Sequence, residues 1–251
     1  MECREQWMTK NSFSRQEELI FKNCDRNRRA RMSTLLSLCA SVAGNDYDAR
    51  GLPYETLLKD YHQVVLLSRI TLKIHRQPQT RDILTITTWE NGSKGAHMRR
   101  VYEMTDQTGE LCVSGRSDWI LVDPDSRSIL RPSAFTVKEF GVCPKDIDCP
   151  ECRKITLPKE GIRELGVRKI TWSDLDGNGH VYSGNYGDII WDALPPELQD
   201  ARPREFSLNY SREATLGEEL RLMGIRRGAT FQMEAVSSAG ICFTCECLFD
   251  L

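Results

Sequence analysis

The sequence predicts an α+β protein made of two copies of one unit, in which a helix lies on an antiparallel sheet. The first observation is an internal repeat, because residues 21–42 align with residues 172–193 without gaps. The second is that four strand-like runs follow each copy in the same order. A chain of 251 residues can also bury a substantial core without metals or disulfides. We therefore expect two related halves.

Each copy of the repeat contains the pattern of an amphipathic helix. Apolar residues recur at the spacing i, i+3, i+4 and i+7, which is the spacing of one helix face. The second helix should end before Pro195 and Pro196. The apolar positions are Met32, Leu35, Leu36, Cys39, Ala40 and Ala43 in the first copy, and Tyr186, Ile189, Ile190, Ala193 and Leu194 in the second.

The runs after each helix have the two-residue period of strands. Phe231, Met233 and Ala235 alternate with polar residues, which indicates a sheet with one wetter face. The short polar connections at residues 105–109 and 237–240 suit hairpins. The last strands of the two copies also correspond, as SDWILVD at residues 117–123 and TCECLFD at residues 244–250.

A helix in front of four or more antiparallel strands must lay its apolar side on one sheet face, so each copy predicts a two-layer unit. Joining the two sheets edge to edge would pair strands whose free edges otherwise invite aggregation. The expected fold class is a tandem (double) hotdog of two helix-on-antiparallel-sheet units. We divide the chain into a first unit at residues 1–135, a linker at residues 136–166 and a second unit at residues 167–251.

Composition limits the classes of partner. The net charge of −2 gives no overall basic surface for nucleic acid, so no nucleic-acid partner is expected. No window approaches the roughly 18 apolar residues of a membrane span. Charged residues also interrupt the first apolar stretches, which argues against a secretory signal and predicts a cytoplasmic protein. Ten cysteines are then expected mostly as buried thiols.

The loop at residues 176–180 carries the side chains most suited to chemistry. Asp176, Asn178 and His180 occupy alternate positions, and an extended backbone would point all three the same way. Glycines between them would let a substrate approach closely. A helix beginning near Ser183 would offer unpaired N–H groups to a developing oxyanion, with Gly184 keeping that end open. The alternative is a turn that merely caps the helix.

The first copy keeps only part of this group. Asp25 and Asn27 match Asp176 and Asn178, but Arg29 stands where the second copy has His180. The repeat alignment also places Gln77 opposite Glu213. One active site per chain is therefore expected, in the second unit.

The duplicated unit, the loop DLDGNGHV followed by Tyr182 and a helix, and the later run Tyr210, Ser211, Arg212 and Glu213 resemble the acyl-(acyl-carrier-protein) thioesterase family. The match covers nearly the whole chain, from about residue 13 to residue 251. Family members carry Asp, Asn and His at alternate positions in that loop and an acidic residue in an Arg-Glu-Cys-like strand motif. This sequence has Ala214 where many plant members have Cys, which argues against a required cysteine nucleophile.

The resemblance implies a bacterial-type enzyme that hydrolyses fatty acyl-carrier-protein thioesters to free fatty acid and carrier protein, without a cofactor or a metal. It implies Asp176 as base or nucleophile, Asn178 as its orienting partner and His180 as a proton-handling group. Glu213 would position the water or tune His180. Its partner would be acyl carrier protein bearing acyl-phosphopantetheine, and a homodimer is left open. Ser183 and Gly184 would bind the carbonyl, and Leu35, Leu36 and Cys39 would line the acyl pocket.

Other functions keep the same fold. An acyl-CoA thioesterase and a non-catalytic acyl-binding regulator are the main alternatives, although buried carboxylates have little use in a mere lipid pocket. Cys149 and Cys152 could be a zinc knuckle or a redox pair, but no second pair of ligands follows them. Basic clusters could dock an acidic carrier, and they lie at residues 26–31, 99–100 and 226–227.

Overall fold

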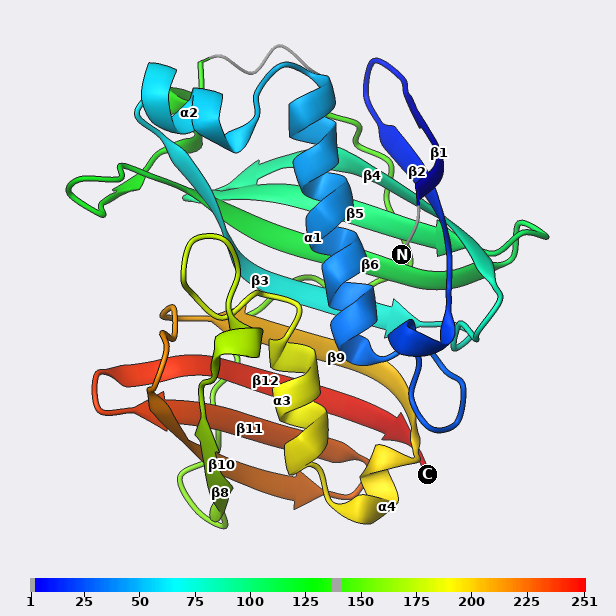
Figure 1. Cartoon of the computed structure of the whole chain (residues 1–251), viewed down its shortest axis with the longest axis vertical. Coiled ribbons are helices and arrows are strands. Elements are labelled where there is room, and N and C mark those ends of the chain that lie inside the picture. Colours follow the sequence, from blue (N-terminus) through cyan, green and yellow to red (C-terminus); the bar gives the residue numbers. More distant parts are fainter. Residues whose placement is uncertain (1–2, 137–140) are drawn as a thin grey trace.

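The computed structural model describes residues 3–136 and 141–251, and it shows a 12-stranded sheet with helices on one face (Figure 1). The strand order is β1-β2-β4-β5-β6-β3-β9-β12-β11-β10-β8, with β7 paired to β6. All strand pairs are antiparallel. The predicted fold class of two helix-on-sheet units is confirmed.

The first unit places a long helix ahead of four long strands. Its elements are β1 (Cys3–Met8), β2 (Phe13–Glu18), a 3-10 turn at Phe21–Asn23, α1 (Met32–Ala49), α2 (Tyr54–Asp60), β3 (Val64–Ile74), β4 (Ile83–Lys94), β5 (His97–Thr105), β6 (Leu111–Val122), β7 (Ile129–Leu130) and a 3-10 turn at Pro132–Ala134. Of the helices in the described residues, none is long and apolar enough to cross a membrane.

The second unit repeats the order with a shorter helix. Its elements are β8 (Arg163–Lys169), a 3-10 turn at Trp172–Asp174, α3 (Tyr186–Ala193), α4 (Pro196–Gln199), β9 (Arg202–Tyr210), β10 (Glu219–Arg227), β11 (Thr230–Ser237) and β12 (Gly240–Asp250). The prediction that the helix begins near Ser183 is wrong, because α3 begins at Tyr186 with Asn185 as its N-cap. Strand β8 begins inside the segment expected to be linker, and the division of the chain at residues 135 and 167 stays a prediction.

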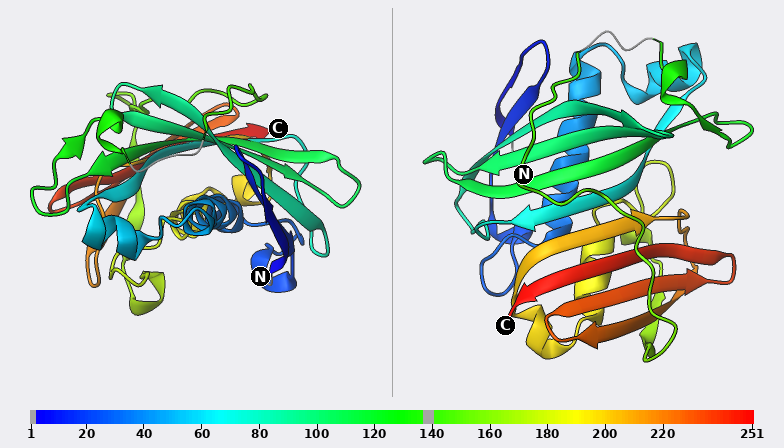
Figure 2. Two further views of the ribbon diagram at one scale, coloured as in Figure 1. Left: turned by 90° about the horizontal axis from the view of Figure 1, so that it is seen from above. Right: turned by 180° about the vertical axis from the view of Figure 1, so that it is seen from behind.

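The two sheets join edge to edge, as expected. Strand β3 pairs antiparallel with β9, so that Ile70 lies opposite Leu208 and Arg69 opposite Asn209. The views from above and from behind show one continuous curved sheet with α1 and α3 on its concave face (Figure 2). This junction brings the two helices together in one layer.

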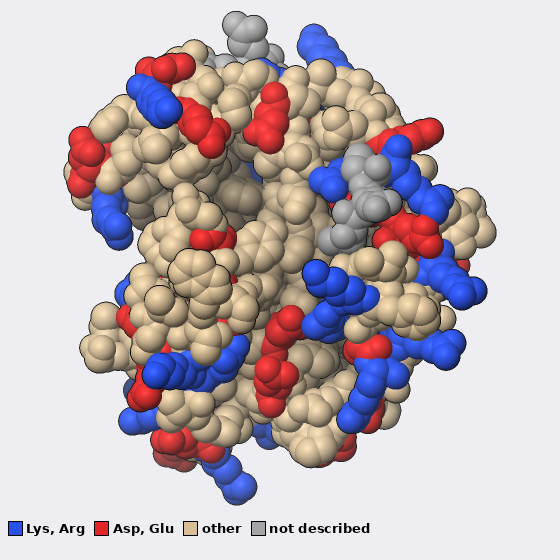
Figure 3. Space-filling model, in the orientation of Figure 1, with Lys and Arg blue, Asp and Glu red and all other residues tan. Residues whose placement is uncertain are grey.

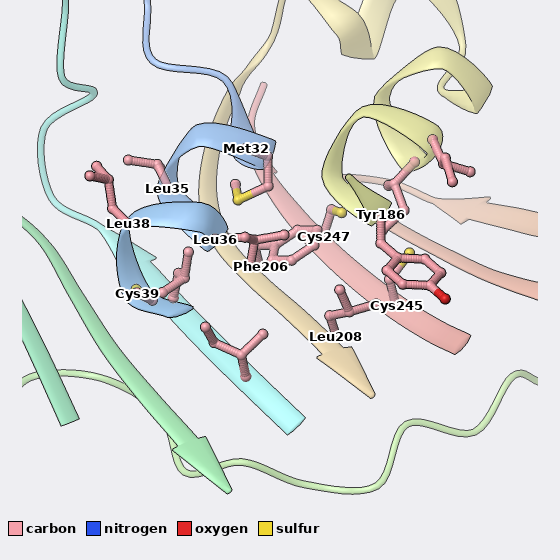
Figure 4. Close-up of a cluster of buried hydrophobic side chains, with 14 of the residues drawn as sticks. Met32, Leu35, Leu36, Leu38, Cys39, Tyr186, Phe206, Leu208, Cys245 and Cys247 are labelled. Carbon is pink, nitrogen blue, oxygen red and sulfur yellow. The ribbon is translucent and has the colours of Figure 1, made fainter. Parts of the chain in front are cut away.

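The main core lies between these helices and the sheet. Leu35, Leu36 and Cys39 of α1 are buried, and so are the strand residues Phe206 and Leu208. Figure 4 shows these side chains meeting with Cys245 and Cys247 from the last strand. The core is therefore shared between the two units.

The segment after residue 140 crosses the outer, convex face of the sheet without forming a helix or strand before β8. Arg116 fixes it by donating from Nε to the carbonyl of Cys149 at 2.9 Å. Lys73 binds Asp148 at 2.6 Å, and Asn209 donates to the carbonyl of Arg153 at 3.0 Å. Residues 137–140 of the predicted linker lie outside the described residues. The described part is held to the sheet by side chains.

A buried ion pair joins α1 to the first sheet. Arg100 is only 1% exposed and binds Asp46 at 2.8 Å and Glu90 at 3.3 Å. Burial opposes the charge of Arg100, but Glu90 and Asp46 outweigh it and hold the pKa of the guanidinium above its ordinary value. The Arg99–Arg100 cluster expected at the surface is thus half buried, and Arg100 cannot dock a partner.

We expect Arg100→Ala to destabilise the fold by about 3 to 5 kcal/mol, because it removes the buried cation between Glu90 and Asp46 and leaves Asp46 with Arg50 alone. The free energy of unfolding from urea titration measures this effect. Arg226→Ala is the matched control, since its pair with Glu197 at 2.6 Å is exposed and should contribute at most about 1 kcal/mol. Equal losses in the two variants would contradict a structural role for the buried pair.

Candidate active site

The loop at residues 176–180 is a tight turn. Its ends pair through a bridge between Leu175 and Val181, and the N–H of Asp176 donates to the carbonyl of His180 at 2.8 Å. Gly179 has φ +80°, a left-handed conformation that costs glycine little. The expectation of an extended backbone that points three side chains the same way is therefore wrong.

The three polar side chains go in different directions from this turn. The carboxylate of Asp176 accepts the N–H groups of Asn178 at 2.8 Å and of His180 at 3.4 Å, so it faces its own loop. Asn178 is exposed, whereas His180 is partly buried. The carboxylate of Asp176 thus stabilises the turn, whereas the side chain of His180 extends away from it.

His180 meets Glu213, as the sequence predicted for two members of one site. His180 Nε2 lies 3.5 Å from Glu213 Oε2, and the two side chains are 30% and 43% exposed. Backbone pairing holds the two residues together. His180 forms an antiparallel β-bridge with Thr215, and the N–H of Val181 donates to the carbonyl of Ala214 at 2.9 Å. A carboxylate beside an imidazole can orient the ring and stabilise its cation.

The first copy has the same turn without this pair. The carboxylate of Asp25 accepts the N–H groups of Asn27 at 2.8 Å and Arg29 at 2.9 Å, and Arg28 takes the left-handed φ of +63°. Gln77 donates instead to the carbonyl of Ala30 at 2.8 Å. The turn is therefore common to both copies, and the His180–Glu213 pair distinguishes the second.

Ser183 and Gly184 lie between this turn and α3. Tyr210 donates its hydroxyl to the carbonyl of Ser183 at 3.1 Å, which ties the segment to the end of β9. A side chain at Gly184 would collide with Ser37, and a Cβ at Gly187 would lie 2.5 Å from the backbone nitrogen of Ser33. Gly184 and Gly187 thus make room for α1, and the expectation that Gly184 keeps this segment open to substrate stays a prediction.

Leu35, Leu36 and Cys39, predicted to line an acyl pocket, are 0%, 2% and 0% exposed in the shared core. None of the three lines the cleft beside Asp25 and Asp188 or the cleft beside Arg69 and Asn209. The surface is nevertheless hollowed between α2 and the loop before α3 (Figure 3). Strand β3 passes this region, and its residues 64–67 are apolar and only half buried. A pocket lined by α1 stays a prediction.

Two family models match this chain. The acyl-ACP thioesterase N-terminal domain matches residues 10–136, and the acyl-ACP thioesterase C-terminal domain matches residues 159–241. The chain belongs to the acyl-ACP thioesterase family. The resemblance inferred from the repeat and the loop is confirmed.

The chain is similar in sequence to plant proteins. The chain is 24% identical over 230 residues to the chloroplastic oleoyl-acyl carrier protein thioesterase 1 of Arabidopsis thaliana, a match that covers 82% of this chain and 62% of that protein. It is 26% identical over 181 residues to the chloroplastic palmitoyl-acyl carrier protein thioesterase of Cuphea hookeriana, covering 68% and 43%. The chain therefore spans about three fifths, or less, of the length of these relatives.

Solved structures share the fold over nearly the whole chain. An acyl-ACP thioesterase from Bacteroides thetaiotaomicron superimposes with a TM-score of 0.85 at 23% identity, covering 97% of this chain and 100% of that one. The 12:0-ACP thioesterase of Umbellularia californica gives 0.78 at 18% identity, covering 97% and 98%. Both similarities show the tandem architecture.

Sequence reasoning missed the residue that closes the loop carrying Glu213 in this member of the family. Arg212 donates to Glu218 at 2.9 Å and to Ser237 at 2.6 Å, and Glu218 accepts the N–H of Thr215 at 2.9 Å. These bonds close the loop that carries Glu213. The repeat contained the signal, because the same alignment places Arg76 opposite Arg212. Arg76 makes the corresponding contacts with Asp82 and Asp106.

The two thiols of the linker's cysteine pair contact backbone carbonyls. The thiol of Cys149 donates to the carbonyl of Thr71 and that of Cys152 to the carbonyl of Arg116. Burial raises the pKa of both thiols to about 12, so they stay protonated at neutral pH. Within residues 3–136 and 141–251, no group of three His, Cys, Asp or Glu side chains could hold a metal ion.

Gly187→Ala is expected to lower the free energy of unfolding by about 1 to 3 kcal/mol, because the added methyl group would displace α1 at Ser33. Chemical denaturation measures the change. Gly177→Ala is the control, since nothing lies within 4 Å of the position its Cβ would take. A Gly187→Ala variant as stable as Gly177→Ala would show that the two helices do not need this close approach.

Proposed function

We propose that this chain hydrolyses acyl-ACP thioesters to free fatty acid and carrier protein. The observation that carries the proposal is the His180–Glu213 pair at 3.5 Å, present in the second copy and replaced by Arg29 and Gln77 in the first. Membership of the acyl-ACP thioesterase family supports the same reaction. We further propose that the protein acts in the cytoplasm.

The geometry favours His180 as the group that moves the proton. Its Nε2 faces Glu213, so Nδ1 is the nitrogen left to accept a proton from water. The carboxylate of Glu213 would stabilise the imidazolium that results. Because 3.5 Å is longer than a normal hydrogen bond, we expect this contact to tighten when substrate is bound.

In the proposed reaction, the water oxygen attacks the thioester carbonyl while His180 takes the proton. The backbone N–H groups of Ser183 and Gly184 would stabilise the oxyanion, and one such donor typically lowers the barrier by about 3 kcal/mol. Collapse of the tetrahedral intermediate breaks the carbon–sulfur bond. The leaving thiolate then takes the proton from His180, which gives a carboxylic acid and a thiol.

Asp176 and Asn178 could shape the turn or take part in the reaction, and a substitution at Asp176 can separate these two roles. The carboxylate of Asp176 holds its own loop, and Asp25 does the same in a copy that lacks the pair. If Asp176 is also the base or nucleophile, as the family resemblance implies, its charge matters as well as its oxygen. An asparagine in its place keeps an acceptor for the turn and removes only the charge.

Two of the basic clusters proposed as carrier docking sites lie far from the His180–Glu213 pair. Arg226 and Arg227 end β10, whereas Glu213 lies in the loop before that strand begins at Glu219. The two ends of β10 are eight residue steps apart, a distance of about 26 Å. Arg26 and Arg29 both contact Asp200 after α4, beyond the far end of α3 from the turn. We therefore assign carrier docking to none of these arginines.

We expect His180→Ala to lower kcat about a hundredfold or more on an acyl-ACP substrate, with folding unchanged. Asp176→Asn should lower kcat by a similar factor if its charge takes part. Asp25→Asn is the matched control, because it makes the same change in the same turn of the first copy. Steady-state hydrolysis, monitored by the thiol released, measures each rate, and an acyl-CoA substrate run in parallel tests the donor.

Equal losses in Asp176→Asn and Asp25→Asn would contradict a single site in the second unit. Full activity of His180→Ala would remove the proposed proton transfer. Unchanged activity of Asp176→Asn alone would leave Asp176 as a residue that only shapes the turn.

A further inference from the structure

A cleft of about 600 Å³ lies on the outer face of the sheet under the linker. We call it the rear cleft. Its floor is one row of outward-facing side chains across four neighbouring strands, Arg69, Asn209, Thr244 and Glu234, which the strand register places side by side. Residues 154–158 of the linker form its roof, and Figure 2 shows this segment running over the convex face.

The rear cleft is basic at its β3 side. Arg69 lies 3.8 Å from Asp118, and 26% of its side chain is exposed. Lys154 is exposed in the roof, and among the ion pairs of the described residues none involves it. Asn209 holds the roof in place by accepting the N–H of Ile155 at 2.7 Å. Two cations thus flank one part of a preformed cleft, which suits a phosphate group.

The other part of the rear cleft reaches the segment that carries Glu213. Ser211 lines it and lies two residues before Glu213. The side chain of Tyr210 lies on the other face of the sheet, where it packs against Tyr186 and donates its hydroxyl to the carbonyl of Ser183. The cleft therefore extends from Lys154 and Arg69 to the end of β9, just before Glu213.

We propose that the rear cleft binds the phosphopantetheine arm of the substrate, with its phosphate at Lys154 and Arg69 and its thioester next to Glu213. This inference rests on the proposed function. From phosphorus to sulfur the arm has about thirteen bonds, the length of a little more than four residues of extended chain, or roughly 15 Å. Four residues separate Asn209, beside Arg69, from Glu213, a span of at most about 14 Å.

The part of the rear cleft along β9 offers polar groups to the arm. The arm carries two amides and a hydroxyl, and Ser68 and Ser211 offer hydroxyl groups there. Its two methyl groups would meet Leu157 and Ile162 of the linker. The acyl chain would continue to the other side of the sheet end, where Figure 3 shows the helix-bearing face hollowed beside the loop before α3.

Lys154→Glu tests the phosphate end, with Lys159→Glu as control. Lys159 is an exposed lysine of the same linker that does not line the cleft. Calorimetric titration of the full chain should show that wild type binds 4′-phosphopantetheine more tightly than pantetheine. Lys154→Glu should weaken the binding of 4′-phosphopantetheine about tenfold, because one charged hydrogen bond is lost. It should leave the binding of pantetheine unchanged. Lys159→Glu should change neither.

Hydrolysis supplies an independent measurement. Lys154→Glu should raise KM for acyl-phosphopantetheine about tenfold at low salt with kcat unchanged. It should leave hydrolysis of the acyl N-acetylcysteamine thioester, which has no phosphate, at the wild-type rate. Wild type that binds phosphopantetheine no better than pantetheine, or equal effects of the two lysine changes, would overturn the inference. Wild type that binds phosphopantetheine at Lys154 but hydrolyses no thioester would refute the proposed function instead.

Discussion

The antiparallel pairing of β3 with β9 is the contact on which the rest of the structure depends. It joins two half-sheets into one and puts α1 beside α3, so that the two units share a core. It also fixes what lies at the end of β9. Because Arg69 faces Asn209, the residues just beyond Tyr210 fall beside the middle of β3, and Glu213 can meet the turn that carries His180. A shift by one residue would turn Leu208 outward and Asn209 into the core.

Duplication explains how a structural turn came to carry a candidate site. Both copies close the turn with an aspartate that accepts two backbone N–H groups. Both also close the loop after the facing strand with an arginine, since Arg76 binds Asp82 and Arg212 binds Glu218. The turn and the loop closed by arginine therefore form in both copies, including the copy that lacks the His180–Glu213 pair. The two copies differ where Arg29 and Gln77 correspond to His180 and Glu213. Arg29 binds Asp25 and the carbonyl of Asp200, and Gln77 donates to the carbonyl of Ala30.

The sequence predicted the architecture and the meeting of His180 with Glu213, because a repeat carries information about pairing that single elements lack. It could not predict the start of α3, since Gly184 and Gly187 are small to accommodate Ser33 and Ser37 of a helix about 150 residues earlier. It also placed Arg100 at the surface, because a charged strand residue is usually exposed. Its partner Asp46 lies on α1, 54 residues away in sequence, and only the tertiary fold brings the two together. The alternation of Asp176, Asn178 and His180 suggested an extended loop, but the left-handed Gly179 closes it into a turn.

The linker acts as part of the fold and not only as a connection. Arg116 holds it through the carbonyls of Cys149 and Ile147, and Asn209 holds it through the N–H of Ile155 and the carbonyl of Arg153. These bonds satisfy backbone groups that would otherwise be buried without partners against the sheet. They also fix the roof of the rear cleft above its floor before any ligand arrives. A cleft whose walls are already held costs less to fill, because binding orders the ligand alone and not the protein as well.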